Sequence, residues 1–303
     1  MQTSRIALKV DVDTLRGTRE GVPRLVAALR QLQAGGSFFF SLGPDHTGRA
    51  LRRVFRRGFL GKVSRTSVLE HYGIRTLLYG TLLPGPRIDL KAGAVMRAVR
   101  AAGFEVGVHC HDHIRWQDGV AHAAAAWTRR EFVRALQAYT GVFGGPAQAH
   151  AAAGWQLNAQ VLNLEHEFGL QYASDCRGSE PFWPTMAGVQ GRCLQLPTTL
   201  PTFDELIGVD GRTAQDAAEE ILRLSRTGVT DTHVFTLHAE LEGQKLLPQF
   251  EFLLRHWREA GMVLTSMRDY HLLLDGAGIA RRELVWGTVP GRSGTLATQG
   301  EVL

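Results

Sequence analysis

Short apolar runs alternate with helix-like segments along most of this chain, and this alternation limits its fold more than any other feature. Apolar runs at 5–10, 37–42 and 104–108 predict buried strands, whereas 20–33 and 92–102 predict helices. The alternation recurs about seven or eight times, which predicts a parallel sheet built from βαβ units. With 303 residues available, this count favours a closed or distorted (β/α) barrel over an open doubly wound sheet.

Residues 1–274 are predicted to form a single domain whose alternation is interrupted once, at 48–86. We expect this interruption to be an insertion that faces a membrane or a lipid. Its basic stretch at 49–63 interleaves arginines with apolar side chains, and its later part is apolar and rich in Gly and Pro. The tail at 275–303 is rich in Gly, Thr and charged residues, so we expect it to be poorly ordered.

Two of the predicted strands end in acidic residues and histidines. Asp11 and Asp13 end the first strand, where their i, i+2 spacing points both carboxylates the same way. His109 and His113 end the third, and their imidazoles converge if the chain turns there. One Asp with two neutral imidazoles is a facial set of metal ligands with open positions for water and substrate. The remaining Asp is then free to take a proton from a water that the metal activates.

Each stretch taken alone also has an ordinary structural interpretation. An Asp-x-Asp after a strand often caps the next helix or turn, and a lone His at a strand end is more often a structural hydrogen bonder. We expect His111 to lie near the metal without binding it, and Cys110 is a weaker candidate still, as a nucleophile. The position of these polar residues along the predicted strands favours an active site. Asp175 and His238 also follow predicted strands, and barrel active sites lie at the carboxyl ends of strands.

Composition limits the partners and the compartment. The formal net charge of +5 suits an anionic partner. A nucleic-acid binder is disfavoured, because the basic stretch carries no recognised nucleic-acid motif. Cys110, Cys176 and Cys193 have neither zinc-knuckle nor disulfide spacing, so we expect free thiols in a reducing cytoplasm. We expect no secretory signal and no transmembrane segment, because no run of about 18 apolar residues occurs. The oligomeric state stays open.

The two polar stretches together resemble the first two motifs of the polysaccharide deacetylases of carbohydrate esterase family 4, which share the NodB homology domain. That family has an Asp-Asp pair and a His-Ser-x-x-His motif; here Val12 is inserted in the first, and Cys110 replaces Ser in the second. The segments RGTREGVPRL, SDCRG, LPTTLPTFDE and HAELEG resemble one branch, the 4-deoxy-4-formamido-L-arabinose-phosphoundecaprenol deformylases. The resemblance runs from about Ile6 to about Leu273 and implies a distorted barrel of about seven parallel strands.

The resemblance implies a role for each residue of the first two motifs. It makes Asp11 the general base in an amide hydrolysis. The implied ligands of a divalent metal ion are Asp13, His109 and His113. This ligand set alone leaves zinc, manganese, cobalt and nickel open as the metal.

The later motifs imply the acid. His238 would protonate the leaving amine, and Asp175 would orient its imidazole and raise its pKa. One departure concerns the family's third motif, which has an Arg that pairs with the base. The segment at 150–155 has none. We expect Arg16 or Arg177 to supply the charge, and the residues do not decide between them.

The implied reaction removes the formyl group from 4-deoxy-4-formamido-L-arabinose linked to undecaprenyl phosphate, for lipid A modification and resistance to cationic peptides such as polymyxin. An enzyme acting on this lipid should attach to the cytoplasmic face of the inner membrane. Within 49–63, arginines and phenylalanines fall on opposite faces of a predicted helix. The expected membrane contacts are Arg52, Arg53, Phe55, Arg56, Arg57 and Phe59. A solvated surface helix is the competing interpretation of this stretch.

Two alternative functions stay open at this level. One is a deacetylase of another N-acyl amino sugar, which a product assay for formate or acetate separates from a deformylase. The other is an inactive module that binds carbohydrate or lipid, which predicts no bound metal. The enzyme is favoured, because the positions of the base, the metal ligands and the acid are all filled.

Overall fold

The computed structural model describes residues 4–50, 73–227 and 231–303. Its framework within these residues is a curled sheet of eight strands that all pair in parallel, in the order β10-β1-β2-β3-β4-β5-β8, with β9 also paired to β1. The strands are β1 (Arg5–Val12), β2 (Ser37–Ser41), β3 (Glu105–Cys110), β4 (Ala149–His150), β5 (Tyr172–Ala173), β8 (Leu194–Gln195), β9 (Thr232–His238) and β10 (Val263–Thr265). The predicted distorted barrel of parallel strands is confirmed.

The central strands are buried on both faces, as their continuous apolar runs predict. All five residues of β2 are buried, and Phe38, Phe39 and Phe40 are fully inaccessible. Strands of a parallel sheet covered on both sides by other elements have this pattern rather than an alternation of apolar and polar residues. The sheet is therefore a rigid base for the side chains at its carboxyl ends.

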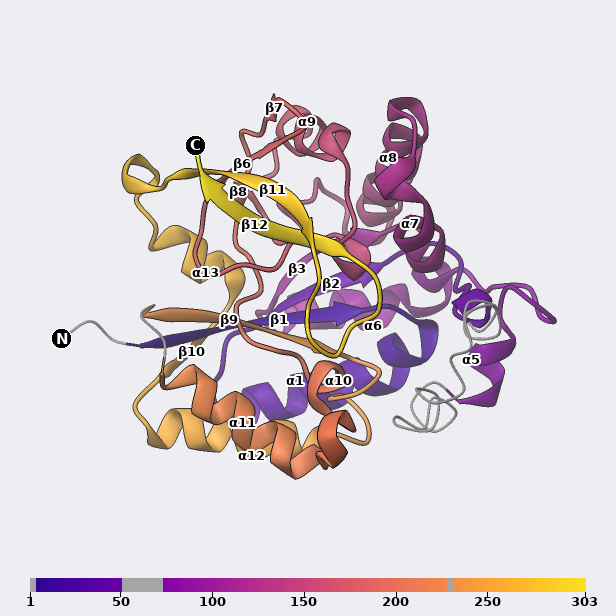
Figure 1. Cartoon of the computed structure of the whole chain (residues 1–303). Coiled ribbons are helices and arrows are strands. Elements are labelled where there is room, and N and C mark those ends of the chain that lie inside the picture. The colour runs from indigo at the N-terminus through magenta and orange to yellow at the C-terminus, as the bar shows by residue number, and fades with distance from the viewer. Residues whose placement is uncertain (1–3, 51–72, 228–230) are drawn as a thin grey trace.

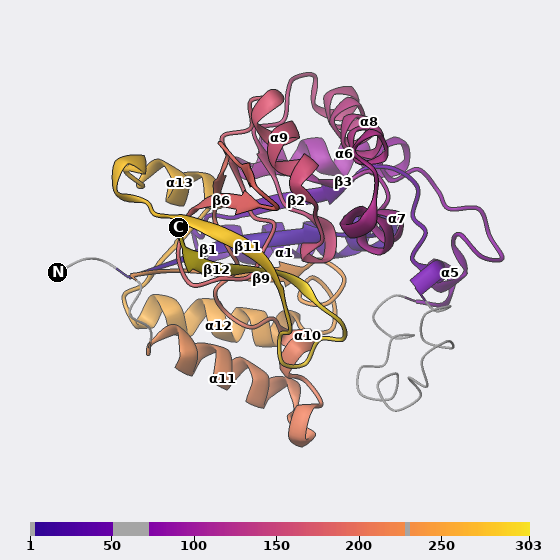
Figure 2. The same ribbon diagram turned by 45° about the horizontal axis from the view of Figure 1, so that its top comes forward.

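Helices surround the sheet. They are α1 (Val22–Gln31), α5 (Ile74–Leu78), α6 (Ile88–Ala101), α7 (His113–Gly119), α8 (Ala125–Phe143), α9 (Ala159–Glu167), α10 (Phe203–Leu206), α11 (Ala214–Ser225), α12 (Leu247–Glu259) and α13 (Met267–Leu272), with short 3₁₀ turns at Val120–His122, Ala153–Trp155, Val209–Gly211 and Gly276–Gly278. In both views α11 and α12 pack together at one end of the molecule, and α8 and α9 lie at the other (Figures 1 and 2). None of the helices in the described residues is long and apolar enough to cross a membrane.

The start of the first helix differs from the prediction. The structure has a π-helical turn, η1 (Gly17–Gly21), before α1. A Cβ on Gly17 would lie 1.9 Å from Oε1 of Glu240, and one on Gly21 would lie 2.0 Å from the carbonyl oxygen of Ala239. Both glycines are therefore required where this turn packs against the end of β9.

The expectation of a poorly ordered tail at 275–303 is wrong. The tail forms β11 (Arg281–Gly287) and β12 (Leu296–Val302), which join β6 (Trp183–Met186) and β7 (Val189–Gln190) in a second sheet of the order β12-β11-β6-β7. Figure 1 shows β11 and β12 lying across the main body of the molecule. Leu284 and Ala297 are buried, and the amide of Arg177 donates to the carbonyl of Ala297 at 2.9 Å. Long-range packing thus orders a segment whose composition is typical of a loose end.

The predicted insertion at 48–86 is described only in part. The expected membrane contacts, Arg52, Arg53, Phe55, Arg56, Arg57 and Phe59, lie outside the described residues. Beyond them, α5 and the following turn carry two strongly exposed apolar side chains, Ile74 at 70% and Leu82 at 81%.

Candidate active site

The polar strand ends meet at one edge of the sheet. β1 pairs with β9 so that Asp11 lies opposite His238, and β2 links β1 to β3. Because these strands are parallel, their carboxyl ends reach the same edge, which brings His109 on β3 toward Asp13 just after β1. Residues separated by more than 200 positions in the chain are therefore neighbours.

Asp13, His109 and His113 form a compact set. The Nε2 atoms of His109 and His113 lie 3.3 and 3.5 Å from Oδ1 of Asp13, and the potential ligand atoms of all three lie within 4.8 Å of one another. His113 begins α7, whose N-cap Asp112 accepts a hydrogen bond from the amide of Arg115 at 3.1 Å. This cap turns the chain sharply after β3, which is how two histidines four residues apart converge.

The hydrogen bonding of this set fits a divalent cation. Nδ1 of His109 donates to the carbonyl of Ala151 at 2.6 Å, which leaves the lone pair on Nε2 facing Asp13. Burial would raise the pKa of Asp13, but the interactions with His113 and His109 hold it well below its usual value, so the carboxylate is ionised. An ionised carboxylate beside two imidazoles suits a metal such as zinc.

Asp11 pairs with a lysine that sequence reasoning overlooked. Nζ of Lys9 lies 3.4 Å from Oδ2 of Asp11, and both side chains are almost completely buried. The same Nζ donates to the carbonyl of Ser174 at 2.9 Å and lies 5.5 Å from the centre of the Trp155 ring. The signal was present: a lysine in an apolar strand, two residues before Asp11, must share its face of the sheet.

Neither arginine that was expected to supply this charge does so. Arg16 pairs with Glu20 at 2.9 Å near the surface. Arg177 pairs with Glu205 and donates to the carbonyls of Thr198 and Leu200, at 3.2 and 2.9 Å. The guanidinium of Arg177 thus binds acceptors in the loop that contains LPTTLPTFDE. It holds this loop in place and does not pair with Asp11.

His238 lies at the end of β9. Its amide donates to Oε2 of Glu242 at 2.7 Å, and its Nδ1 is buried without a hydrogen-bond partner among the described residues. Burial alone would lower the pKa of the imidazole, but the negative charges of Asp204, Asp13, Glu242 and Asp11 raise it above its ordinary value. A raised pKa favours the protonated imidazole, which is the form that a general acid requires.

Asp175 does not take the predicted position beside His238. Its Oδ1 lies 3.0 Å from Nδ1 of His150 and accepts from the amide of Ala152 at 2.7 Å, and its Oδ2 accepts from Nε2 of Gln195 at 2.9 Å. The prediction that Asp175 orients His238 is therefore wrong, because His150 on the neighbouring strand β4 occupies the carboxylate. Asp204 contributes most among the charges that raise the pKa of His238.

His150 also contacts Glu165, at 3.0 Å, so these two residues and Asp175 form a second cluster of potential metal ligands. All three are fully buried. Burial and the charge of Asp175 raise the pKa of Glu165 well above its ordinary value, which keeps this carboxyl protonated. The contacts of this cluster tie β4 and α9 to the residue after β5.

Glu240, within HAELEG, is a further residue that the sequence reasoning did not interpret. Its Oε1 accepts from the amide of Asp13 at 3.1 Å and from the amide and hydroxyl of Thr14, both at 2.8 Å. Burial, and then the charge of Asp13, raises the pKa of Glu240 to about 8. Glu240 thus holds the loop that carries Asp13, and Gly17 leaves the space for it.

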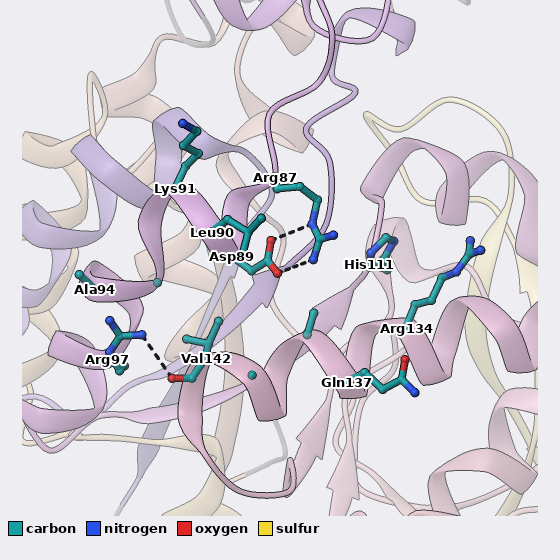
Figure 3. Close-up of a pocket in the computed structure, with 13 residues that line it drawn as sticks. Arg87, Asp89, Leu90, Lys91, Ala94, Arg97, His111, Arg134, Gln137 and Val142 are labelled. Atoms are coloured by element: carbon teal, nitrogen blue, oxygen red, sulfur yellow. Dashed lines mark hydrogen bonds and ion pairs between the residues drawn. The ribbon is translucent and has the colours of Figure 1, made fainter.

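His111 and Cys110 are close to His109 in the sequence but do not belong to the metal set. His111 lines a separate cavity of about 880 Å³ between α6 and α8, with Arg87, Arg97 and Arg134 (Figure 3). Cys110 is buried, and burial raises the pKa of its thiol well above the ordinary value, which disfavours a nucleophilic thiolate. Neither residue belongs to the set that Asp13, His109 and His113 form.

Two of the relatives that comparison with known proteins finds are similar over almost the whole chain. No family model matches it. A protein of Shewanella sediminis (strain HAW-EB3), named "Probable 4-deoxy-4-formamido-L-arabinose-phosphoundecaprenol deformylase ArnD", is 35% identical over 99% of this chain and 96% of its own length. A protein of Wigglesworthia glossinidia brevipalpis with the same name is 31% identical over 95% of this chain and 99% of its own length.

Solved structures show the same fold at lower identity. A protein of Mycobacterium smegmatis described as a polysaccharide deacetylase aligns with a TM-score of 0.65 and 17% identity, over 95% of this chain and 96% of its own. One of Pseudomonas aeruginosa PAO1, also described as a polysaccharide deacetylase, aligns with a TM-score of 0.58 and 16% identity, over 89% and 90%. The likeness to these structures concerns the fold, a NodB-like deacetylase barrel.

Proposed function

This chain belongs to the family of 4-deoxy-4-formamido-L-arabinose-phosphoundecaprenol deformylases, hydrolases of amide C–N bonds, and we propose that it is a metal-dependent deformylase of that lipid-linked sugar. The observation that carries the proposal is the convergence of Asp13, His109 and His113 beside the Asp11–His238 strand pair. Three metal ligands and two groups that can move protons are the parts that a metal-dependent amide hydrolysis uses.

The chain's own residues supply the proton transfers. A divalent cation held by Asp13, His109 and His113 would polarise the formamide carbonyl and lower the pKa of water. Asp11 takes a proton from the water while the oxygen of that water attacks the carbonyl carbon. His238 gives a proton to the nitrogen as the C–N bond breaks, so that the sugar leaves as an amine and the formyl group leaves as formate. An unprotonated amide nitrogen is a poor leaving group, which is why the acid is needed.

We place the enzyme on the cytoplasmic face of the inner membrane, peripherally attached, because its proposed substrate carries an undecaprenyl chain. Withdrawing that chain into water costs about 0.8 kcal/mol per CH₂. Support comes from Ile74 at the start of α5, Leu82 in the turn that follows α5 and Leu90 in α6, which are 70%, 81% and 75% exposed. The adjacent cavity, lined by Arg87, Lys91, Arg97 and Arg134, would favour an anionic surface (Figure 3).

The product would be the free 4-amino sugar for lipid A modification and resistance to cationic peptides such as polymyxin. The test is a product assay on the purified protein, with its metal content measured by elemental analysis. We expect about one divalent ion per chain and release of formate from the formamido sugar linked to undecaprenyl phosphate. Release of acetate from an acetamido analogue, without formate, would instead identify a deacetylase. A metal-free protein with no turnover would support the inactive binding module.

A further inference from the structure

Lys9 is held in the sheet from both sides. It lies in β1 opposite Ser37 of β2 and Thr236 of β9, and its side chain is 0% exposed. An ammonium group without contact to water needs an anion or several acceptors to offset its desolvation. The structure supplies the carboxylate of Asp11 at 3.4 Å and the carbonyl of Ser174 at 2.9 Å. The position of Nζ is thus determined by the core of the sheet and does not depend on a mobile surface chain.

The contact divides the two oxygens of Asp11 between different tasks. Oδ2 faces Nζ of Lys9. Oδ1 is buried, accepts no hydrogen bond among the described residues, and lies 3.9 Å from Nδ1 of the metal ligand His109. Because Lys9 holds Oδ2, the other oxygen of Asp11 is left beside the imidazole of His109. An oxygen with unused lone pairs at that place is the one able to take a proton from the attacking water.

We propose that Lys9 is the positioning residue of the general base, which fixes the carboxylate of Asp11 so that Oδ1 faces the water. The proposal rests on the proposed function. It explains how this chain works without an arginine at 150–155, since the charge comes from the strand that carries the base. The hydrogen bond from Lys9 to Ser174 also joins β1 to the loop after β5. Asp11 is therefore held relative to both of these strands.

The test is a double-mutant cycle that combines Lys9→Met with Asp11→Asn. Methionine keeps the length of the side chain and removes the charge. Lys9→Met alone should lower kcat by about 10- to 100-fold, with KM changed less than about threefold and the metal retained. In the Asp11→Asn background the same change should lower kcat by less than about twofold, because the carboxylate that Lys9 positions is gone. Lys9→Arg should restore part of the rate.

Equal losses in both backgrounds would overturn the proposal, because Lys9 would then support the fold and not the base. A fully active Lys9→Met protein would overturn it as well. Should Lys9→Met alone fail to fold, the comparison runs between Lys9→Arg and the double variant, which buries no unpaired charge; an Arg variant no more active than the double variant would contradict the idea. Lys245→Met, the same change at an exposed position, is the control. A wild-type protein that releases no formate would instead overturn the proposed function.

Discussion

Asp11 on β1 and His238 on β9 are register partners in adjacent parallel strands, so the proposed base and acid leave the sheet side by side. The pairing runs without a break from Arg5 opposite Thr232 to Asp11 opposite His238. Backbone hydrogen bonds in the core therefore set the separation of the two catalytic groups. The sheet thus holds the two catalytic groups in place before the substrate binds, which reduces the free energy needed to orient them.

The metal set gives the first prediction. His109→Ala should lose both the bound metal and turnover, because Asp13 and His113 alone are a poor site for a divalent ion. The loss of turnover should exceed about 100-fold, measured as formate release, with the metal measured by elemental analysis. His111→Ala is the matched control; it removes a neighbouring imidazole that lines the separate cavity, and it should keep the metal. A metal-replete, active His109→Ala protein would refute the assignment.

The second prediction separates the base from the ligand. Asp11→Asn should retain the metal and lose about 100-fold or more of kcat, because an amide cannot accept the proton. Asp13→Asn should lose the metal. Metal content and kcat of the two variants, measured together, check the assignment; a metal-free Asp11→Asn protein beside a metal-replete Asp13→Asn protein would mean that the two roles are reversed.

The third prediction concerns the space around Glu240. A Cβ at Gly17 would lie 1.9 Å from Oε1 of Glu240, the oxygen that holds the Asp13 loop. Gly17→Ala should therefore lower the free energy of unfolding by about 1–3 kcal/mol and weaken metal binding. Gly141→Ala is the control: its Cβ would meet nothing within 4 Å in helix α8, so it should be neutral or stabilising by up to about 1 kcal/mol. Urea unfolding and metal titration measure both effects.

The fourth prediction concerns pH and stability. Burial raises the pKa of Glu105, at the start of β3, despite hydrogen bonds from Ser37 and the amide of Arg268. The folded state thus favours the protonated carboxyl. That stability is complete below the unfolded pKa of about 4.5 and is lost as the pH rises through the raised folded pKa. Glu105→Gln removes this loss, so its stability relative to wild type should increase with pH in urea unfolding between about pH 5 and pH 8. A difference that does not change with pH would contradict this.

The fifth prediction tests the membrane surface. Leu82→Glu combined with Leu90→Glu should weaken binding to anionic vesicles and lower activity on substrate embedded in them, because two exposed apolar contacts become charged. Activity on a short-chain, water-soluble analogue should stay within about twofold. Leu272→Glu, at a residue 70% exposed on α13, is the control; α13 and α5 lie on opposite sides in both views (Figures 1 and 2). Equal losses on both substrates would show that the changes act on the site or the fold.

Local patterns in the sequence are enough to predict the parallel barrel. They also place Asp11, Asp13, His109 and His113 at or just after strand ends. A continuous apolar run predicts a buried strand, and a polar residue at its end must reach the edge of the sheet. These inferences need no knowledge of which distant segments touch.

The pairing of the buried charges, in contrast, follows from the complete fold. Asp175 meets His150, and Lys9 meets both Asp11 and Ser174, 165 positions away. The tail at 275–303 is ordered because it hydrogen bonds to the backbone of Arg177 and because β11 pairs with β6. Which cation reaches a buried carboxylate depends on how the sheet curls and closes. The free energy of burying a charge depends on its neighbours, and only the complete fold brings these neighbours together. A local sequence pattern therefore does not determine which charges pair.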